Sequence, residues 1–302
     1  ILTLGQRRIA RPATLFLAHG RGVEFQLGYD IVKTGNMRWN VGLTGTYLKN
    51  RITSLPIEPF LRSASYNKVE QGHSVYEWWL YQWAGVDPQT GLNIFEIADE
   101  FISDTSEDIV SVNGINYTTN MAKAREDYSG SSIPDLFGGI NTSLSWKGFT
   151  LSLDLYYQLG GWTYDRAYEN VMIGALVSTN SVNLSPDLAA NMWRKPGDVT
   201  NVPILTTNST YASNVHGARS TRWLTTTNML EINSLNIAYS LPKKWCERIK
   251  LSKIQVYLAG DHLYVFNARM GLNSNYTLSN YDSGGDRFSP SRTISLGVNI
   301  TL

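Results

Sequence analysis

A strict two-residue alternation of side chains is the feature that most constrains this chain. Residues 146–160 read "WKGFTLSLDLYYQLG", and from Phe149 apolar residues alternate with small polar ones. Successive side chains of a β-strand point to opposite faces, so this segment predicts a strand with one apolar face. A soluble sandwich would bury that face in a protein core, whereas a transmembrane barrel would turn it to lipid. One strand fits both architectures.

The same alternation recurs along the chain, at 22–33, 37–50, 138–146, 230–241, 252–260 and 293–302. Within 230–241 the parity changes after Ile232, which predicts a β-bulge near Asn233 and Ser234. The second face carries Asn, Ser, Thr, Gln, Gly and Tyr, whereas the outer face of a sandwich usually carries charges. The strands are also about 10–14 residues long, which is longer than globular strands and long enough to cross a bilayer. Both observations favour a barrel.

The connections between these segments sort by length. Short ones cover 34–36, 147–148 and 242–251, and long ones cover 51–75, 98–135, 161–228 and 265–290. Bacterial outer-membrane barrels have short periplasmic turns and long external loops. Counting back from a periplasmic C-terminus places every long connection outside. The hairpin 76–97 around "DPQTG" either spans the membrane or stands above it, and the sequence leaves this open.

Composition excludes several classes of protein. Lys and Arg number 26 against 25 Asp and Glu, so no nucleic-acid partner is expected. The chain has no apolar run long enough for a transmembrane helix, and its one cysteine, Cys246, excludes an internal disulfide. It begins without Met or a signal peptide, and it holds few strands for its very long loops. We therefore expect the C-terminal arc of a larger barrel.

Candidate chemistry is sparse. The four histidines are scattered without metal-ligand spacing, and the sequence predicts no catalytic residue, no metal and no cofactor. The longest connection is instead rich in aromatic residues. Three interpretations stay open for them: packing of the loop on itself, contact with a protein lid, or stacking on a substrate. These candidate contact residues are Trp162, Tyr164, Trp193, Tyr211 and Trp223.

Several sequence blocks resemble SusC/RagA-type TonB-dependent outer-membrane transporters. Blocks similar to the motifs of that family occur in order along residues 19–302. They are "HGRGVEFQLGYDIVKTGNMRWNVGLTGTYLKNRITSLP" (19–56), "WAGVDPQTGLNIF" (83–95), "SSIPDLFGGINTSLSWKGFTLSLDLYYQLGG" (131–161), "LEINSLNIAYSLPKKW" (230–245), "VYLAGDHLYVF" (256–266) and "RTISLGVNITL" (292–302). The sequence departs from the family at His262, where Asn is usual, and at Leu302, where an aromatic residue usually ends the barrel.

The resemblance implies an all-β fold, an antiparallel transmembrane barrel of 22 strands, of which residues 1–302 form the C-terminal part. It implies that a plug domain and a TonB-contact segment belong to the absent N-terminal part. It also implies import of an oligosaccharide or a peptide, a SusD-like surface lipoprotein as lid, and TonB as energy source. The implied location is the outer membrane of a Gram-negative, Bacteroidetes-like cell, with the C-terminus in the periplasm.

Two other functions remain compatible with the pattern: a secreted all-β glycan-binding or adhesion protein, and a self-contained passive porin. The barrel hypothesis assigns one face of each strand to outer-membrane lipid, which separates a barrel of either kind from the secreted protein; a plug domain encoded upstream would separate the importer from the porin. The residues expected to face lipid are Phe149, Leu151, Leu153, Leu155, Ile294, Leu296, Val298 and Ile300.

Overall fold

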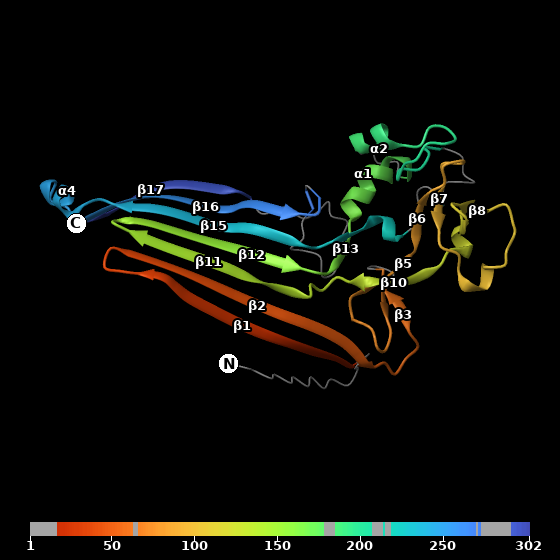
Figure 1. Ribbon diagram of the computed structural model, residues 1–302, viewed down its shortest axis with the longest axis horizontal. Coiled ribbons are helices and arrows are strands. Elements are labelled where there is room, and N and C mark those ends of the chain that lie inside the picture. Colours follow the sequence, from red (N-terminus) through yellow and green to blue (C-terminus); the bar gives the residue numbers. More distant parts are fainter. Residues whose placement is uncertain are drawn as a thin grey trace.

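A computed structural model describes residues 17–62, 66–177, 185–206, 214, 219–269, 271–272 and 291–302. Its main element is one seven-stranded antiparallel sheet, drawn as the long ribbons of Figure 1. The sheet order is β1 (Leu17–Lys33), β2 (Met37–Ser54), β11 (Leu136–Trp146), β12 (Phe149–Leu159), β15 (Met229–Ser240), β16 (Lys253–Asn267) and β17 (Thr293–Thr301). The predicted strands are confirmed, and they run from 9 to 18 residues.

Short connections join the strands at one end of the sheet. The turn between β1 and β2 closes with a 2.8 Å hydrogen bond from the Thr34 N–H to the Met37 carbonyl. Lys147 and Gly148 join β11 to β12, and both have positive φ, of 45° and 88°. Two such residues form the kind of tight hairpin turn whose twist matches that of the flanking strands. A six-residue helix, α4 (Lys243–Arg248), joins β15 to β16.

The predicted bulge in β15 is confirmed. On the β12 side Asp154 pairs with Ser234 and Leu155 with Ile232, so Asn233 has no partner in the ladder. β16 makes a matching irregularity, because Ile232 pairs with Tyr264 but Ser234 pairs with Asp261. His262 sits in this bulge with φ of 49°. Among residues other than glycine, Asn and His are enriched in that left-handed region, which gives a physical reason why either side chain suits the position.

The long connections build a separate body at the opposite end of the sheet, here called the loop head (Figure 1). It contains short strands and short helices from the segments 55–135 and 160–228. Its strands are β3 (Phe60–Arg62), β4 (Asn67–Val69), β5 (Glu77–Tyr81), β6 (Trp83–Val86), β7 (Asn93–Phe95), β8 (Ile109–Val112), β9 (Ile115–Thr118), β10 (Glu126–Ser131), β13 (Trp162–Tyr164) and β14 (Leu224–Thr226). Its helices are η1 (Asp99–Phe101), η2 (Met121–Lys123), α1 (Arg166–Val177), α2 (Pro186–Asn191) and η3 (Thr221–Trp223).

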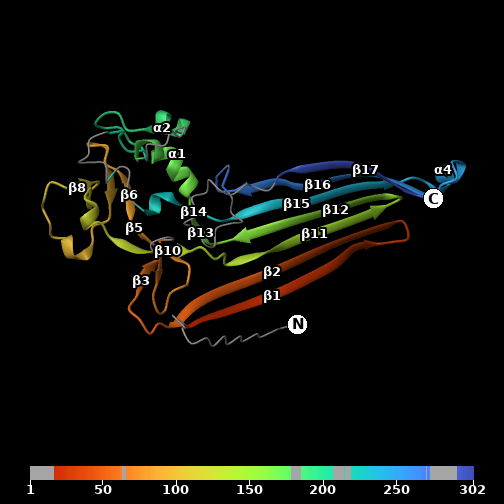
Figure 2. The same cartoon turned by 180° about the vertical axis from the view of Figure 1, so that it is seen from behind.

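The structure answers the question that the sequence left open about the hairpin 76–97. Its strands β5, β6 and β7 belong to two small sheets of the loop head and not to the seven-stranded sheet. The connection from β2 to β11 is therefore a single long excursion, and the alternation of short and long connections is preserved. Figure 2 shows the same division from behind, with the sheet extending away from the head.

Candidate functional site

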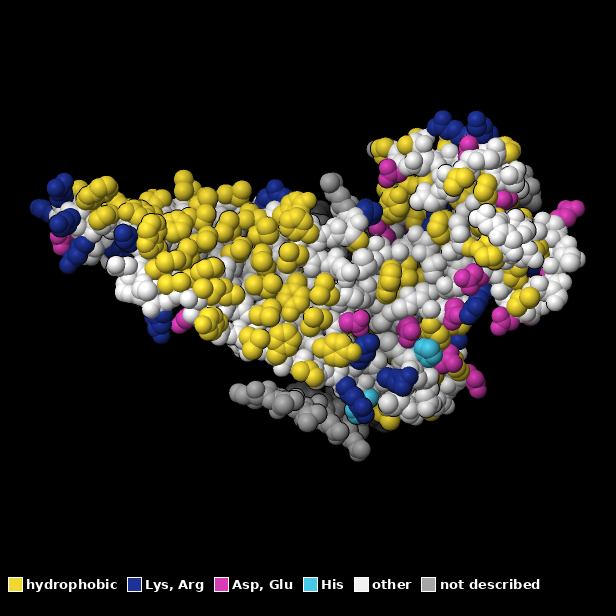
Figure 3. Space-filling view, viewed as in Figure 1, with side chains coloured by type: hydrophobic (Ala, Val, Ile, Leu, Met, Phe, Trp, Pro, Cys, Tyr) yellow, Lys and Arg dark blue, Asp and Glu magenta, His cyan; other side chains and the backbone are white. Residues whose placement is uncertain are grey.

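The seven-stranded sheet has one continuous apolar face. The strand register aligns side chains of the same parity across the whole sheet, so Leu153 on β12 lies between Thr142 on β11 and Leu235 on β15. A neighbouring row runs through Leu27, Leu43, Ile140, Leu155, Ile232 and Tyr264. Figure 3 shows these side chains as a broad hydrophobic surface. Leu27 is 61% exposed and Leu296 is 77% exposed, so no element of the described chain covers this face there.

The apolar face is as long as a membrane-crossing strand of a tilted barrel, which has about 9–11 residues. Trp146 and Phe149 pair near its short-turn end, and Tyr157 lies near its other end on β12. At about 3.3 Å per residue, the eight steps from Phe149 to Tyr157 cover about 26 Å along the strand. Exposed aromatic rings also cluster near both ends, including Trp39 and Tyr239 at one and Tyr264 and Phe266 at the other. Aromatic girdles of this kind flank the apolar band of membrane barrels.

All eight residues predicted to face lipid lie on this face. Ile294, Leu296, Val298 and Ile300 are exposed on the edge strand β17. Those of β12 are partly exposed, because neighbouring strands flank them on both sides. No second sheet of the described chain packs on Leu151 or Leu153, as a sandwich would require. Contact of these side chains with lipid stays a prediction.

The opposite face is polar, with mostly hydroxyl and amide side chains. Its charged side chains are mainly carboxylates, namely Glu24, Asp30, Asp154, Glu231 and Asp261. Near the short turns this face has a shallow depression of about 330 Å³ lined by Thr150, Ser152, Asn236, Ala238, Gln255, Tyr257 and Asn299. Asp154 accepts a 2.8 Å hydrogen bond from the Ser234 hydroxyl across the bulge. The hydroxyl and amide groups of this face can bind water or a polar cargo through hydrogen bonds.

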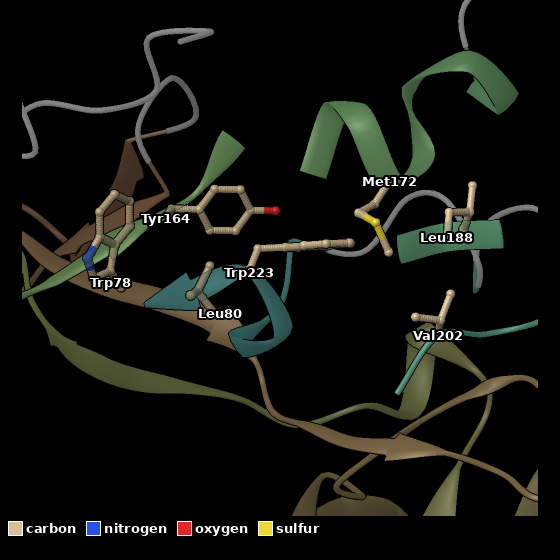
Figure 4. Close-up of a cluster of buried hydrophobic side chains, with 7 residues drawn as sticks. All are labelled: Trp78, Leu80, Tyr164, Met172, Leu188, Val202 and Trp223. Atoms are coloured by element: carbon tan, nitrogen blue, oxygen red, sulfur yellow. The ribbon is translucent and has the colours of Figure 1, made fainter. Parts of the chain in front are cut away.

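Two of the predicted contact aromatics lie in a hydrophobic core inside the loop head (Figure 4). Tyr164 and Trp223 are 3% and 4% exposed and pack with Trp78, Leu80, Met172, Leu188 and Val202. The Tyr164 hydroxyl donates a 3.0 Å hydrogen bond to the buried Glu169 carboxylate. Burial, followed by the nearby Glu169 charge, raises the pKa of Tyr164. The structure thus gives these two rings the packing role that was one of the open interpretations.

Trp193 is also buried, and its position explains the "DPQTG" motif. Its indole N–H donates a 3.0 Å hydrogen bond to the Pro88 carbonyl. The ring lies over Gly91, where an added Cβ would come within 2.5 Å of it and where φ is 74°. Asp87 closes the turn by accepting hydrogen bonds from Thr90. The motif therefore forms a turn on which Trp193 packs, and this contact joins the segment 55–135 to the segment 160–228.

Trp162 differs from these three rings because it is 44% exposed. Its carbonyl accepts a 2.8 Å hydrogen bond from the Trp78 indole, so the buried core fixes its backbone. Its ring lies beside Gly130, where a Cβ would again clash. Tyr211 lies outside the described residues. Contact with a lid or a substrate stays a prediction for these positions, and Trp162 is the described member with a ring that a partner could reach.

Sequence reasoning missed a cluster of aromatic and charged side chains on β4, β5 and β10. The Lys68 ammonium lies 3.8 Å from the Trp79 ring, and His73 stacks on Tyr128 at 3.6 Å. The Tyr128 hydroxyl donates a 2.7 Å hydrogen bond to Glu70. Hydrogen bonds from Lys68 and Tyr128 lower the pKa of Glu70. The aromatic run "EWWLYQW" (77–83) was the available signal, but the cluster also needs Tyr128, which comes from a distant segment.

The loop head also holds an open cavity of about 520 Å³ between η1, η2 and β10. Its charged lining residues are Asp99, Glu100, Arg125, Glu126 and Asp127. Arg125 pairs with Asp127 at 2.6 Å, and Arg219 pairs with Glu126. These pairs neutralise Asp127 and Glu126, and Asp99 and Glu100 leave the cavity polar with a net negative lining.

The described part of the chain was compared with the arrangements that hold a metal ion or cross a membrane as a helix. Groups of three or more His, Cys, Asp or Glu placed to hold a metal ion do not occur among these residues. The longest described helix, α1, has 12 residues, and no described helix is both long and apolar enough to cross a membrane.

These features define an open arc of an antiparallel β-barrel wall that carries large loops at one end. Solved structures confirm this fold. The structure of the RagAB peptide transporter matches with a TM-score of 0.73 and 19% identity over 94% of this chain. The RagAB peptide importer matches in its "open-open" state (TM-score 0.70, 18% identity) and in its "closed-closed" state (0.68, 17%).

The chain spans 29–30% of the length of the matched chains in those structures. The expected resemblance to SusC/RagA-type barrels is thus confirmed at the level of the fold. Neither a protein-family model nor a curated protein sequence matches the chain.

Proposed function

We propose that this chain forms part of the barrel wall and the external loops of a SusC/RagA-type TonB-dependent importer in the outer membrane. The observation that carries the proposal is the two-faced sheet, apolar and uncovered on one side and polar on the other. Water cannot stabilise so large an exposed apolar surface, whereas lipid can. The polar face would then line an aqueous lumen, and the chain would act in transport and not as an enzyme.

We further propose a peptide as the cargo, with an oligosaccharide as the alternative within the same family. The similar structures are those of a peptide transporter, which supports the peptide. A SusD-like lipoprotein would cover the loop head, and TonB would act through a part of the protein that precedes this chain. The many hydroxyl and amide groups of the polar face support a cargo recognised by hydrogen bonds, such as a peptide backbone.

A labelling experiment tests the orientation. In a Cys246→Ser background, a cysteine at Val199 would report on the loop head, where that side chain is 91% exposed. A matched cysteine at Ile249, which is 58% exposed, would report on the short-turn end. A membrane-impermeant maleimide applied to intact cells should label the first and not the second. The reverse result would invert the proposed topology.

An uptake experiment tests the function. The complete protein should co-purify with a surface lipoprotein encoded nearby, and uptake of labelled peptides should stop when TonB is deleted. Uptake that persists without TonB would instead support a passive porin. A protein that stays soluble, binds glycans and shows no heat-modifiable migration would support the secreted glycan binder.

A further inference from the structure

Basic side chains gather at the short-turn end of the seven-stranded sheet. The segments 30–38, 145–150, 240–254 and 299–302 form this end, and they contain eight basic residues against two acidic ones, Asp30 and Glu247. The whole chain is almost balanced, with 26 basic and 25 acidic residues. The basic residues, here called the basic collar, are Lys33, Arg38, Lys147, Lys243, Lys244, Arg248, Lys250 and Lys253.

The helix α4 holds part of the collar in a fixed position. Cys246 is 1% exposed and anchors the helix from within, while Trp245 is 60% exposed. The chain ends the helix tightly, because the Leu251 N–H donates a 3.0 Å hydrogen bond to the Cys246 carbonyl. Lys250 takes the left-handed conformation there, with φ of 59°. The turn therefore holds the backbone of its basic residues in place beside the exposed Trp245 indole.

Most cations of the collar have no carboxylate partner within the described part of the chain. Lys243 lies 3.5 Å from Glu247, and Lys33 lies 3.7 Å from Asp30. No ion pair with a described residue forms at the other six, namely Arg38, Lys147, Lys244, Arg248, Lys250 and Lys253. The collar thus offers a positive field that the chain itself leaves uncompensated.

The collar continues directly from the apolar face. The Lys147 ammonium lies 5.5 Å from the centre of the Trp146 ring, at the edge of that face. Val256 is exposed on β16, which follows the α4 turn, and Ile300 is exposed on the neighbouring strand β17. Figure 3 shows dark blue side chains at the end of the hydrophobic surface, where α4 lies in Figure 1. When lipid chains cover the apolar face, their phosphates come to lie at the height of the collar.

We propose that the basic collar is a binding site for anionic phospholipid headgroups in the leaflet at the short-turn end. The inference rests on the proposed function, because it requires lipid against the apolar face, and it adds a preference for headgroup charge. Charge complementarity and continuity with the apolar face both select this occupant. Lys and Arg near an anionic membrane surface attract its lipids, while Trp245 provides the interfacial anchor.

The test compares two pairs of neighbouring basic residues in the complete protein. Lys243→Gln/Lys244→Gln removes two charges from the collar. Arg194→Gln/Lys195→Gln removes two exposed charges from the loop head and is the matched control. Each protein is placed in nanodiscs that contain phosphatidylcholine and, as the anionic lipid, phosphatidylglycerol. Native mass spectrometry then measures the lipids that stay bound after mild detergent release.

Wild type and the control should bind phosphatidylglycerol over phosphatidylcholine at a ratio above that of the nanodisc, and in the collar variant this bound ratio should fall by about fivefold for each charge removed. High salt should weaken the enrichment in wild type, which tests the idea without any variant. Equal retention in all three proteins, or equal loss in the control, would overturn the proposal. Failure of wild type to show heat-modifiable migration in nanodiscs would instead contradict the proposed barrel.

Discussion

Leu153→Arg tests the assignment of the two faces most directly. Leu153 lies on β12, four residues from Phe149 and four from Tyr157, and thus about 13 Å along the strand from each end of the apolar face. This places it near the middle of the proposed bilayer core. An arginine at mid-membrane on the lipid face of a barrel costs about 2–4 kcal/mol, because the guanidinium leaves water without a partner.

Ser152→Arg is the matched control, since the two positions are adjacent and point to opposite faces. Ser152 pairs with Ser143 and Asn236 on the polar face, where an arginine would stay hydrated. We expect a cost there well below that of Leu153→Arg. Both variants are made in the complete protein, and denaturant unfolding in lipid vesicles, followed by heat-modifiable migration, measures the free energy of unfolding. Equal costs, or a larger cost at Ser152, would refute the assignment.

Three further predictions concern the loop head and the sheet edges. Hydrogen bonds, the largest from Lys123, lower the pKa of Asp104 from 3.8 to about 2, so the folded head binds this proton less readily than the unfolded chain. The resulting stabilisation of the folded head should be complete above pH 4 and should vanish as the pH falls towards about 2. Protease resistance of the head should therefore drop over this pH range in wild type and not in Lys123→Met. Trp162→Ala should weaken co-purification with the lid, or uptake, while the head stays folded. Trp193→Ala should instead lower the free energy of unfolding of the head by about 3–5 kcal/mol and make it protease-sensitive. Unchanged binding and uptake in Trp162→Ala would assign that ring a packing role. Residues 1–302 expressed alone should form no conducting monomer, because β1 and β17 leave unpaired backbone groups that lipid cannot satisfy, and a stable conductance would favour the passive porin.

The spanning strands could be predicted because their pattern is local. A period of two sets the face of every side chain once the strand forms, and the turn residues at Lys147 and Gly148 set the register of the hairpin. The bulge at Asn233 was visible for the same reason, since one extra residue inverts the parity. The sequence alone thus predicts that the strands exist, which side chains share a face of each strand, and which connections are short or long.

The loop head could not be predicted in this way, because its contacts join segments far apart in the chain. Trp193 meets the turn at Pro88 and Gly91 across about a hundred residues, and Trp78 meets the Trp162 carbonyl over 84. An aromatic residue in a loop has the same sequence appearance whether it is buried or offered to a partner. Only the packed structure separated the buried Tyr164, Trp193 and Trp223 from the exposed Trp162. The local period of two therefore determines the strands of the seven-stranded sheet, whereas the free energy of packing between distant segments determines the structure of the loop head.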